Sequence, residues 1–157
     1  MRKRTIHIKW TFPVLLDNFD KAKYKDYNGI YAISRIWGEK TGDPQDEKLL
    51  YIGKTIRSFE QRIREHTQYK LYGIRGNIYV RFGIIQTQFT TELLDDIESA
   101  LIYELQPPLN VDKTVEYHYK SDYFVRIIND GYRGVGLIEK EIDARTHYNE
   151  SKELLCR

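Results

Sequence analysis

Two tyrosines lie in short stretches of similar composition and reversed order. Gly29–Tyr31 is Gly-Ile-Tyr, whereas Tyr51–Gly53 is Tyr-Ile-Gly and is followed directly by Lys54. A phenol can transfer a proton, but its reference pKa of about 10 leaves only about a thousandth of it ionised at pH 7. A neighbouring cation or metal would favour the phenolate. Because the chain has 13 tyrosines, the two triplets taken alone favour ordinary β-sheet tyrosines.

A glutamate interrupts the apolar stripe of a predicted helix. The amphipathic segment Thr91–Leu105 places its leucines and isoleucines in one arc, and Glu98 falls inside that arc. A buried carboxylate is unfavourable unless a cation or a metal accompanies it. Glu104 lies near the same stripe, so the periodicity leaves both candidates open. For each of them, a position on the flank of the helix with access to solvent is the alternative.

A shorter helix is predicted to begin after Ser58, which is a favourable N-cap with a glutamine three residues later in a capping-box pattern. Phe59, Ile63 and His66 then recur on one face. Arg62 precedes His66 by four residues, so their side chains can point the same way. A single histidine on an apolar face is more often a hydrogen-bonded core residue than a catalyst.

The remaining pattern predicts one α+β domain with a small, mainly antiparallel three-stranded sheet flanked by helices. The chain of 157 residues suits a single domain. A long polar loop, Gly38–Lys48, is expected to join the first two strands. The segments predicted as strands are Ile30–Trp37, Leu49–Ile52, Ile78–Ile85 and Tyr123–Ile128, followed by a turn at Asn129–Gly131 and a closing helix at Asp143–Leu155.

Composition and charge narrow the class of protein. The net charge of +2 does not by itself indicate a nucleic-acid partner, although basic residues are concentrated at Arg2–Arg4, Lys21–Lys25 and Lys54–Arg64. No apolar run approaches the roughly 20 residues that span a bilayer, so no membrane partner is expected. The N-terminal segment lacks the apolar stretch of a secretory signal. The only cysteine, Cys156, cannot form an intrachain disulfide, which is typical of the cytoplasm.

The order and spacing of the polar residues resemble the GIY-YIG nuclease family. The two triplets come first, Arg62 follows Tyr51 by eleven positions in a helix, and His66 follows four positions later. Glu98 begins the segment ESALIYELQPPLN, which Asn110 closes. The resemblance covers Gly29–Asn110, about half of the 157 residues.

The resemblance implies a GIY-YIG-like catalytic core at residues 29–110, an N-terminal extension at 1–28 and a C-terminal extension at 111–157. The connection between the triplets is longer than is usual in the family, so Gly38–Lys48 is interpreted as an insertion. The length of the chain favours a stand-alone enzyme similar to the small restriction endonucleases.

The resemblance also implies hydrolysis of DNA phosphodiester bonds, with duplex DNA as the expected substrate. Glu98 would hold Mg²⁺ or Mn²⁺ through one carboxylate oxygen. Arg62 would contact the non-bridging phosphate oxygens. It implies a proton-transfer role for the two tyrosines and leaves the assignment open; Tyr31 is favoured as the general base and Tyr51 as its partner.

Further residues are expected to bind the substrate. His66 and Lys54 would hold phosphate or water, and Asn110 would orient either Glu98 or a backbone segment. Additional phosphate contacts, insensitive to base sequence, are predicted for Arg57, Arg64, Arg75, Arg81 and the lysines at 21, 23 and 25.

Three questions stay open at this point. A nucleic-acid-binding module of the same fold without catalytic activity is one alternative, and a nuclease for RNA or branched DNA is another. The sequence does not fix the oligomeric state, and a homodimer is compatible with it.

Overall fold

A computed structural model of the chain describes residues 2–18, 23–24, 27–36, 47–69, 71, 73–115, 120–134 and 136–144. Within these residues the fold is one mixed seven-stranded sheet with two α-helices and a short 3-10 helix. The strands follow the order β4-β3-β5-β1-β6-β7, with β2 paired to β5. Their bounds are β1 Arg2–Trp10, β2 Val14–Leu15, β3 Gly29–Ile36, β4 Glu47–Thr55, β5 Asn77–Ile85, β6 Tyr123–Gly131 and β7 Glu141–Asp143, and the helices are η1 Leu16–Asn18, α1 Phe59–Tyr69 and α2 Thr91–Leu105.

The predicted three-stranded sheet forms one part of this larger sheet. Strand β3 pairs antiparallel with β4 on one side and with β5 on the other, which confirms the predicted core strands. The prediction of only three strands is wrong, because β1 continues the sheet beside β5 and pairs in parallel with β6. Both extensions of the chain therefore contribute strands to the sheet of the core.

The missed strand β1 carries a recognisable signal. Ile6, Ile8 and Trp10 are buried, whereas the intervening His7 and Lys9 are exposed. This alternation with period two is typical of a strand with one buried face. The basic residues Arg2–Arg4 in the same segment obscure this alternation.

The predicted turn at Asn129–Gly131 is also wrong, because these residues complete β6. The Asn129 side chain is buried and accepts a hydrogen bond from the Trp10 indole at 2.9 Å. A polar residue that usually favours turns therefore satisfies a buried donor inside the sheet. Of the predicted closing helix, Asp143 ends β7, Ala144 follows in a turn, and positions 145–155 lie outside the described residues. Most of the predicted loop Gly38–Lys48 also lies outside them, but Glu47 and Lys48 already belong to β4.

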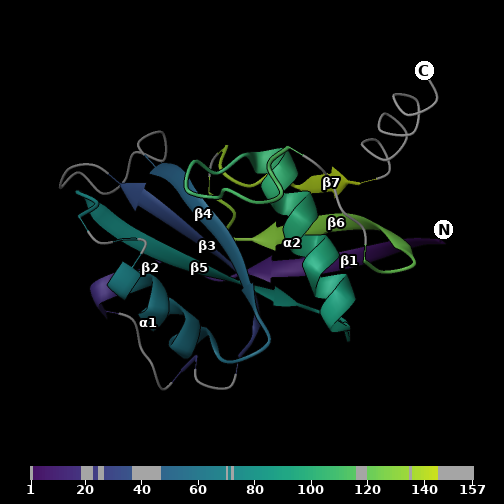
Figure 1. Cartoon of the computed structure of the whole chain (residues 1–157), viewed down its shortest axis with the longest axis horizontal. Helices are drawn as coiled ribbons and strands as arrows, with labels where there is room; N and C mark the ends of the chain where they lie inside the picture. The colour runs from purple at the N-terminus through teal and green to yellow at the C-terminus, as the bar shows by residue number, and fades with distance from the viewer. Residues whose placement is uncertain are drawn as a thin grey trace.

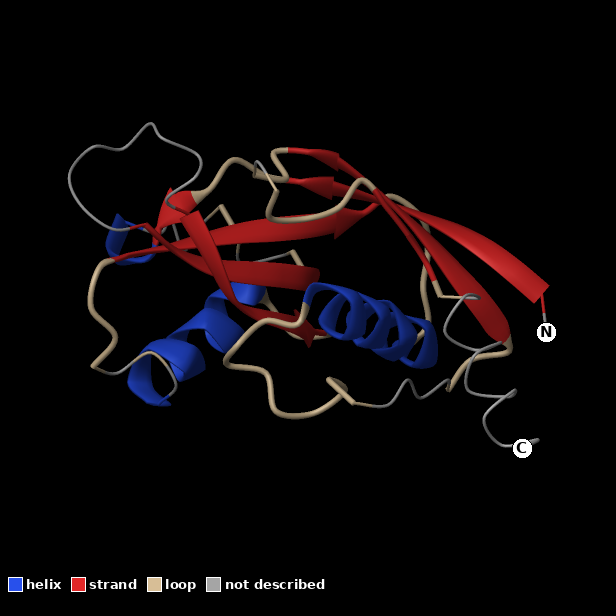
Figure 2. Cartoon of the chain, turned by 90° about the horizontal axis from the view of Figure 1, so that it is seen from above, coloured by secondary structure: helices blue, strands red, loops and turns tan. Residues whose placement is uncertain are grey.

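The two helices pack on opposite faces of the sheet where it ends at β4. One core joins α2 to Ile30, Ala32 and Ile52, and a second core joins α1 to residues that alternate with these, including Tyr31 and Ile33. Figure 1 shows β4 running between α1 and α2. Seen from above, the sheet is strongly curled (Figure 2).

Local hydrogen bonds fix the helix starts as the sequence predicts. The Ser58 hydroxyl accepts a bond from the Gln61 N–H at 3.3 Å, and the Thr90 hydroxyl accepts one from the Leu93 N–H at 3.1 Å. Helix α2 ends at Leu105 and is capped by Gln106, whose left-handed backbone precedes a proline. Among the described helices, none is long and apolar enough to cross a membrane.

Arg81 is a buried structural residue, so the predicted phosphate contact at this position is wrong. Its side chain is 4% exposed, and its guanidinium forms a two-point ion pair with Glu47 and donates to the Tyr132 carbonyl at 2.9 Å. The Ser34 hydroxyl donates to the same carboxylate at 2.6 Å. Burial would raise the pKa of Glu47, but the bonds from Arg81 and Ser34 lower it below its ordinary value.

We expect Arg81→Met to destabilise the protein by about 3 kcal/mol, because Glu47 would remain buried without its partner. Urea unfolding at pH 7 measures the change. The double variant Glu47→Leu/Arg81→Met should recover most of the loss, since it removes both buried charges. Arg126→Met is the control, because it breaks an exposed ion pair with Glu141 and should change stability little. Wild-type stability in Arg81→Met would show that the pair contributes nothing.

Candidate active site

The mirrored triplets lie side by side in β3 and β4. The register places Tyr31 opposite Gly53 and Ile33 opposite Tyr51. Since alternate residues of a strand share a face, the two tyrosines lie diagonally on the same face. Their ring centroids are 6.2 Å apart. The reversed order of the triplets therefore brings both phenols to the face that α1 covers.

Gly53 leaves the space that the Tyr31 ring occupies. A Cβ atom at position 53 would collide with the hydroxyl and ring of Tyr31 and would lie 2.8 Å from Cε1 of Tyr51. Glycine is therefore required at position 53 because the Tyr31 ring lies against its backbone. Gly29 is favoured for a different reason: its backbone φ of +129° is a conformation that other residues rarely adopt.

Helix α1 brings Arg62 to the Tyr31 hydroxyl. Phe59 and Ile63 are buried against the tyrosine face, as the helical periodicity predicts. Arg62 Nε donates to Tyr31 Oη at 3.2 Å, and Nη1 donates to Glu65 at 2.8 Å. Arg62 therefore lies directly beside the first tyrosine.

The environment of Tyr31 differs from the expectation that nearby cations favour its phenolate. Burial raises the pKa of Tyr31 far above its ordinary value, and the negative charges of an ionised Tyr51 and of Glu98 add to the increase. Arg62 acts in the opposite direction but does not compensate. The phenol of the substrate-free chain is therefore protonated at neutral pH.

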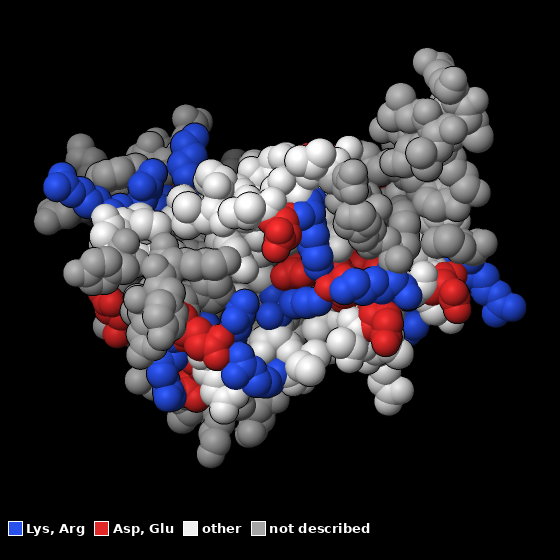
Figure 3. Space-filling model, in the orientation of Figure 1, with Lys and Arg blue, Asp and Glu red and all other residues white. Residues whose placement is uncertain are grey.

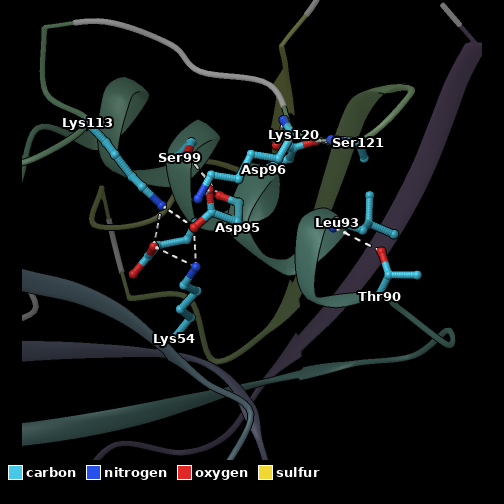
Figure 4. A network of polar contacts seen from close by, with 10 residues as sticks. Lys54, Thr90, Leu93, Asp95, Asp96, Ser99, Lys113, Lys120 and Ser121 are labelled. Atoms are coloured by element: carbon cyan, nitrogen blue, oxygen red, sulfur yellow. Dashed lines mark hydrogen bonds and ion pairs between the residues drawn. The ribbon is translucent and has the colours of Figure 1, made fainter.

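Glu98 and Lys54 meet on the other face of β4. Lys54 follows Gly53 and so points toward α2, where its ammonium pairs with Asp95 and lies 3.8 Å from Glu98 Oε2. Lys113 Nζ donates to Glu98 Oε2 at 2.6 Å and to Asp95 Oδ1 at 2.8 Å. Figure 4 shows Lys54 and Lys113 converging on Asp95. Of the two glutamates that periodicity left open, Glu98 is the buried one.

Asp95 is a site residue that the sequence analysis missed. It precedes Glu98 by three residues, so both carboxylates lie on one flank of α2. Burial would raise the pKa of Asp95, but hydrogen bonds from Lys113, Lys54 and Lys120 hold it well below its ordinary value. The helical wheel could have revealed this second acid, whereas the lysines from the later loop could not be placed by periodicity.

Asn110 holds the outer edge of β4. Its amide accepts a bond from the Ile52 N–H at 2.9 Å and donates to the Ile52 carbonyl at 2.8 Å. Leu109 adds a bond to the Leu50 carbonyl at 2.9 Å. These contacts agree with the predicted orientation of a backbone segment, whereas a direct substrate contact by Asn110 stays a prediction.

The other residues predicted to bind the substrate do not all lie beside Arg62. Arg57 is exposed and donates to Glu65 at 2.7 Å beside Arg62. Arg64 pairs with Glu60 on the exposed side of α1. The backbone of His66 belongs to α1, but its side chain lies outside the described part. Of the lysines predicted to contact phosphate, Lys23 is exposed, and positions 21 and 25 lie outside the described residues.

A small cavity of about 210 Å³ opens between the two helices at the end of β4. Basic residues and the first turn of α2 form its walls, and in Figure 3 lysines and arginines form a band across this face with acidic residues interspersed. The lining residues are Lys54, Thr55, Ile56, Arg57, Arg62, Thr91 and Leu94. The cavity therefore offers positive charge for a phosphate group.

The donor set at Glu98 suits a hard divalent cation. In the described part of the chain, no three His, Cys, Asp or Glu side chains are grouped as metal ligands. Mg²⁺ binds proteins through one or two carboxylates and retains water. Glu98 and Asp95 provide two, and the Lys113 ammonium between them shows that a cation fits there.

A comparison with protein-family models identifies the class. Residues 27–123, well over half of the chain, match the GIY-YIG catalytic domain. This chain belongs to the GIY-YIG family, whose catalytic domain implies nuclease activity on a nucleic-acid substrate and typically uses a divalent metal. Comparisons with curated proteins and with solved structures gave no significant match.

We expect Gly53→Ala to lower stability by about 1–3 kcal/mol, because the added methyl group must displace the Tyr31 ring. Thermal unfolding measures stability, and single-turnover cleavage should fall in parallel as Tyr31 moves from Arg62. Gly136→Ala is the control, since its Cβ would enter open space although its φ is +68°. It should cost about 1 kcal/mol and leave cleavage unchanged. Equal effects of the two variants would contradict the close-approach requirement.

Proposed function

We propose that this protein is a metal-dependent endonuclease that hydrolyses DNA phosphodiester bonds. One observation carries the proposal: Tyr31, Arg62 and Glu98 lie around one cavity at the end of the edge strand β4. Arg62 lines this cavity and donates to Tyr31, and Lys54 lines it and lies 3.8 Å from Glu98. These three residues come from three different elements of the fold. Their convergence supports the roles that the sequence analysis assigned to Arg62 and Glu98.

Arg62 is suited to bind the scissile phosphate. Its guanidinium is held by Tyr31 and Glu65, and the same side chain lines the cavity. A planar guanidinium can donate two parallel bonds to the non-bridging oxygens, which stabilises negative charge on the phosphorus centre. A divalent cation bound at Glu98 would stabilise the negative charge of the leaving oxygen. Lys54 and Arg57 would position the neighbouring phosphates.

The two tyrosines take different roles in this proposal. Burial keeps Tyr31 protonated, so its hydroxyl is a hydrogen-bond donor that orients the attacking water or a phosphate oxygen. This replaces the role of general base that the sequence analysis gave to Tyr31. Tyr51, on the same face with its ring 6.2 Å away, becomes the candidate base.

Duplex DNA is the substrate we favour, as expected for a compact enzyme that resembles the small restriction endonucleases. The cavity provides contacts to phosphate, which DNA and RNA share. RNA and branched DNA are therefore the competing substrates. Homodimerisation and a cytoplasmic location stay predictions from the sequence.

Plasmid cleavage tests the proposed function. We expect the protein to cut supercoiled plasmid with Mg²⁺ and not with EDTA, and we expect Glu98→Gln to be inactive but folded. Folding should persist because Lys113 keeps its bond to Asp95. Glu104→Gln on the same helix is the matched control and should cleave normally. Binding of DNA without cleavage by the wild type would favour the non-catalytic alternative, and cleavage of RNA or branched DNA alone would change the substrate.

Tyrosine variants test the division of roles. Tyr31→Phe should lower the single-turnover rate by about 10²-fold at every pH between 6 and 9, because it removes one oriented donor whose protonation does not change in that range. Tyr51→Phe should instead flatten the rise of the rate with pH. If Tyr31→Phe flattens the profile and Tyr51→Phe does not, the original assignment of Tyr31 as base is restored.

A further inference from the structure

The Lys113 ammonium lies between the two carboxylates of α2. It donates to Glu98 Oε2 at 2.6 Å and to Asp95 Oδ1 at 2.8 Å, so one cation bridges both acids. A divalent metal on either oxygen of Glu98 would lie next to this ammonium, and the two positive charges would repel each other. The lysine and the metal therefore cannot both keep close contact with this carboxylate.

The other two lysines of the cluster are arranged differently. Lys54 pairs with Asp95 and lies 3.8 Å from Glu98, whereas Lys120 reaches Asp95 Oδ2 at 3.1 Å and is 59% exposed. Both can stay on Asp95 while Glu98 changes its partner. With three ammonium groups and two carboxylates, the cluster already carries excess positive charge. A divalent cation would thus enter most readily if one ammonium left, and Lys113 has the shortest contact with Glu98.

The loop that carries Lys113 can move without disturbing the core. Lys113 has a φ of 66°, which is unfavourable for a residue with a side chain. The neighbouring Val111 and Val115 are 87% and 84% exposed, so no buried side chain at these positions must be withdrawn. The contacts of the ammonium with Asp95 and Glu98 thus help to hold an otherwise unfavourable backbone conformation.

We propose that Lys113 is an internal competitor of the divalent metal for Glu98. In the substrate-free enzyme the lysine neutralises the buried carboxylate, and metal binding displaces its ammonium from Glu98. The inference rests on the proposed function, since it takes Glu98 as the metal ligand. It adds that metal affinity is set by a lysine outside the segment in which the sequence analysis located the catalytic residues.

Direct titration of the full-length protein with Mn²⁺ at low ionic strength, without nucleic acid, tests this. Lys113→Met should bind Mn²⁺ about tenfold more tightly than the wild type, because a like charge beside the ligand oxygen is removed. Lys120→Met is the matched control. It removes a lysine that also contacts Asp95 but not Glu98, and being exposed it should change the dissociation constant by less than about threefold.

The outcomes separate the two proposals. If Glu98→Gln abolishes Mn²⁺ binding while Lys113→Met binds no more tightly than the wild type, the competition is refuted and the metal assignment stands. If Glu98→Gln binds Mn²⁺ like the wild type, Glu98 is not the ligand and both proposals fail. If Lys113→Met does not fold, the inference can be tested on the wild type by ¹⁵N NMR of the lysine side chains. Addition of Mg²⁺ should then increase the mobility of the Lys113 ammonium. Unchanged mobility at saturating Mg²⁺ would overturn the inference.

Discussion

The close approach of the Tyr31 ring to Gly53 is the contact on which the site depends. It requires β3 and β4 to pair in one register, since a shift of β4 by one residue would turn Tyr51 toward α2 and move Gly53 away from Tyr31. The same contact brings the Tyr31 hydroxyl within 3.2 Å of Arg62 Nε. A side chain at position 53 would disrupt both arrangements. The glycine of the second triplet thus controls the geometry of a residue on the neighbouring strand.

The site also depends on the position of β4 at the edge of the sheet. Alternation along a strand sends Tyr51 to the α1 face and Lys54 to the α2 face. In the middle of a sheet, neighbouring strands would separate groups on opposite faces, but at an edge they can approach the same substrate. An open edge invites pairing with other chains. Here Asn110 and Leu109 occupy its hydrogen-bonding groups at Ile52 and Leu50 and so protect it.

The sequence predicts the local elements well and the long-range pairing poorly. Helix α2 matches its predicted span Thr91–Leu105, because apolar periodicity, a threonine cap and a proline all agree. The position of β1 between β5 and β6 depends on contacts between distant segments, which no local pattern specifies. At the site, periodicity limited the buried acid of α2 to Glu98 or Glu104 and put Arg62 on the same side of its helix as His66. It could not show that Arg81 is buried in an ion pair with Glu47. Glu47 was predicted to lie in the polar loop Gly38–Lys48 and not in the sheet.

The charge balance of the site explains why a net charge of only +2 is compatible with a phosphate-binding enzyme. The described cations around the cavity have carboxylate partners in the substrate-free chain: Arg57 and Arg62 share Glu65, and Lys54 pairs with Asp95. Exposed pairs such as Arg57 with Glu65 cost little to break, so a phosphate can take over the arginine. Asp95 is buried, so its pair with Lys54 resists such exchange. Substrate and metal therefore bind by replacing partners at specific positions, and affinity depends on which ion pairs break more than on total charge.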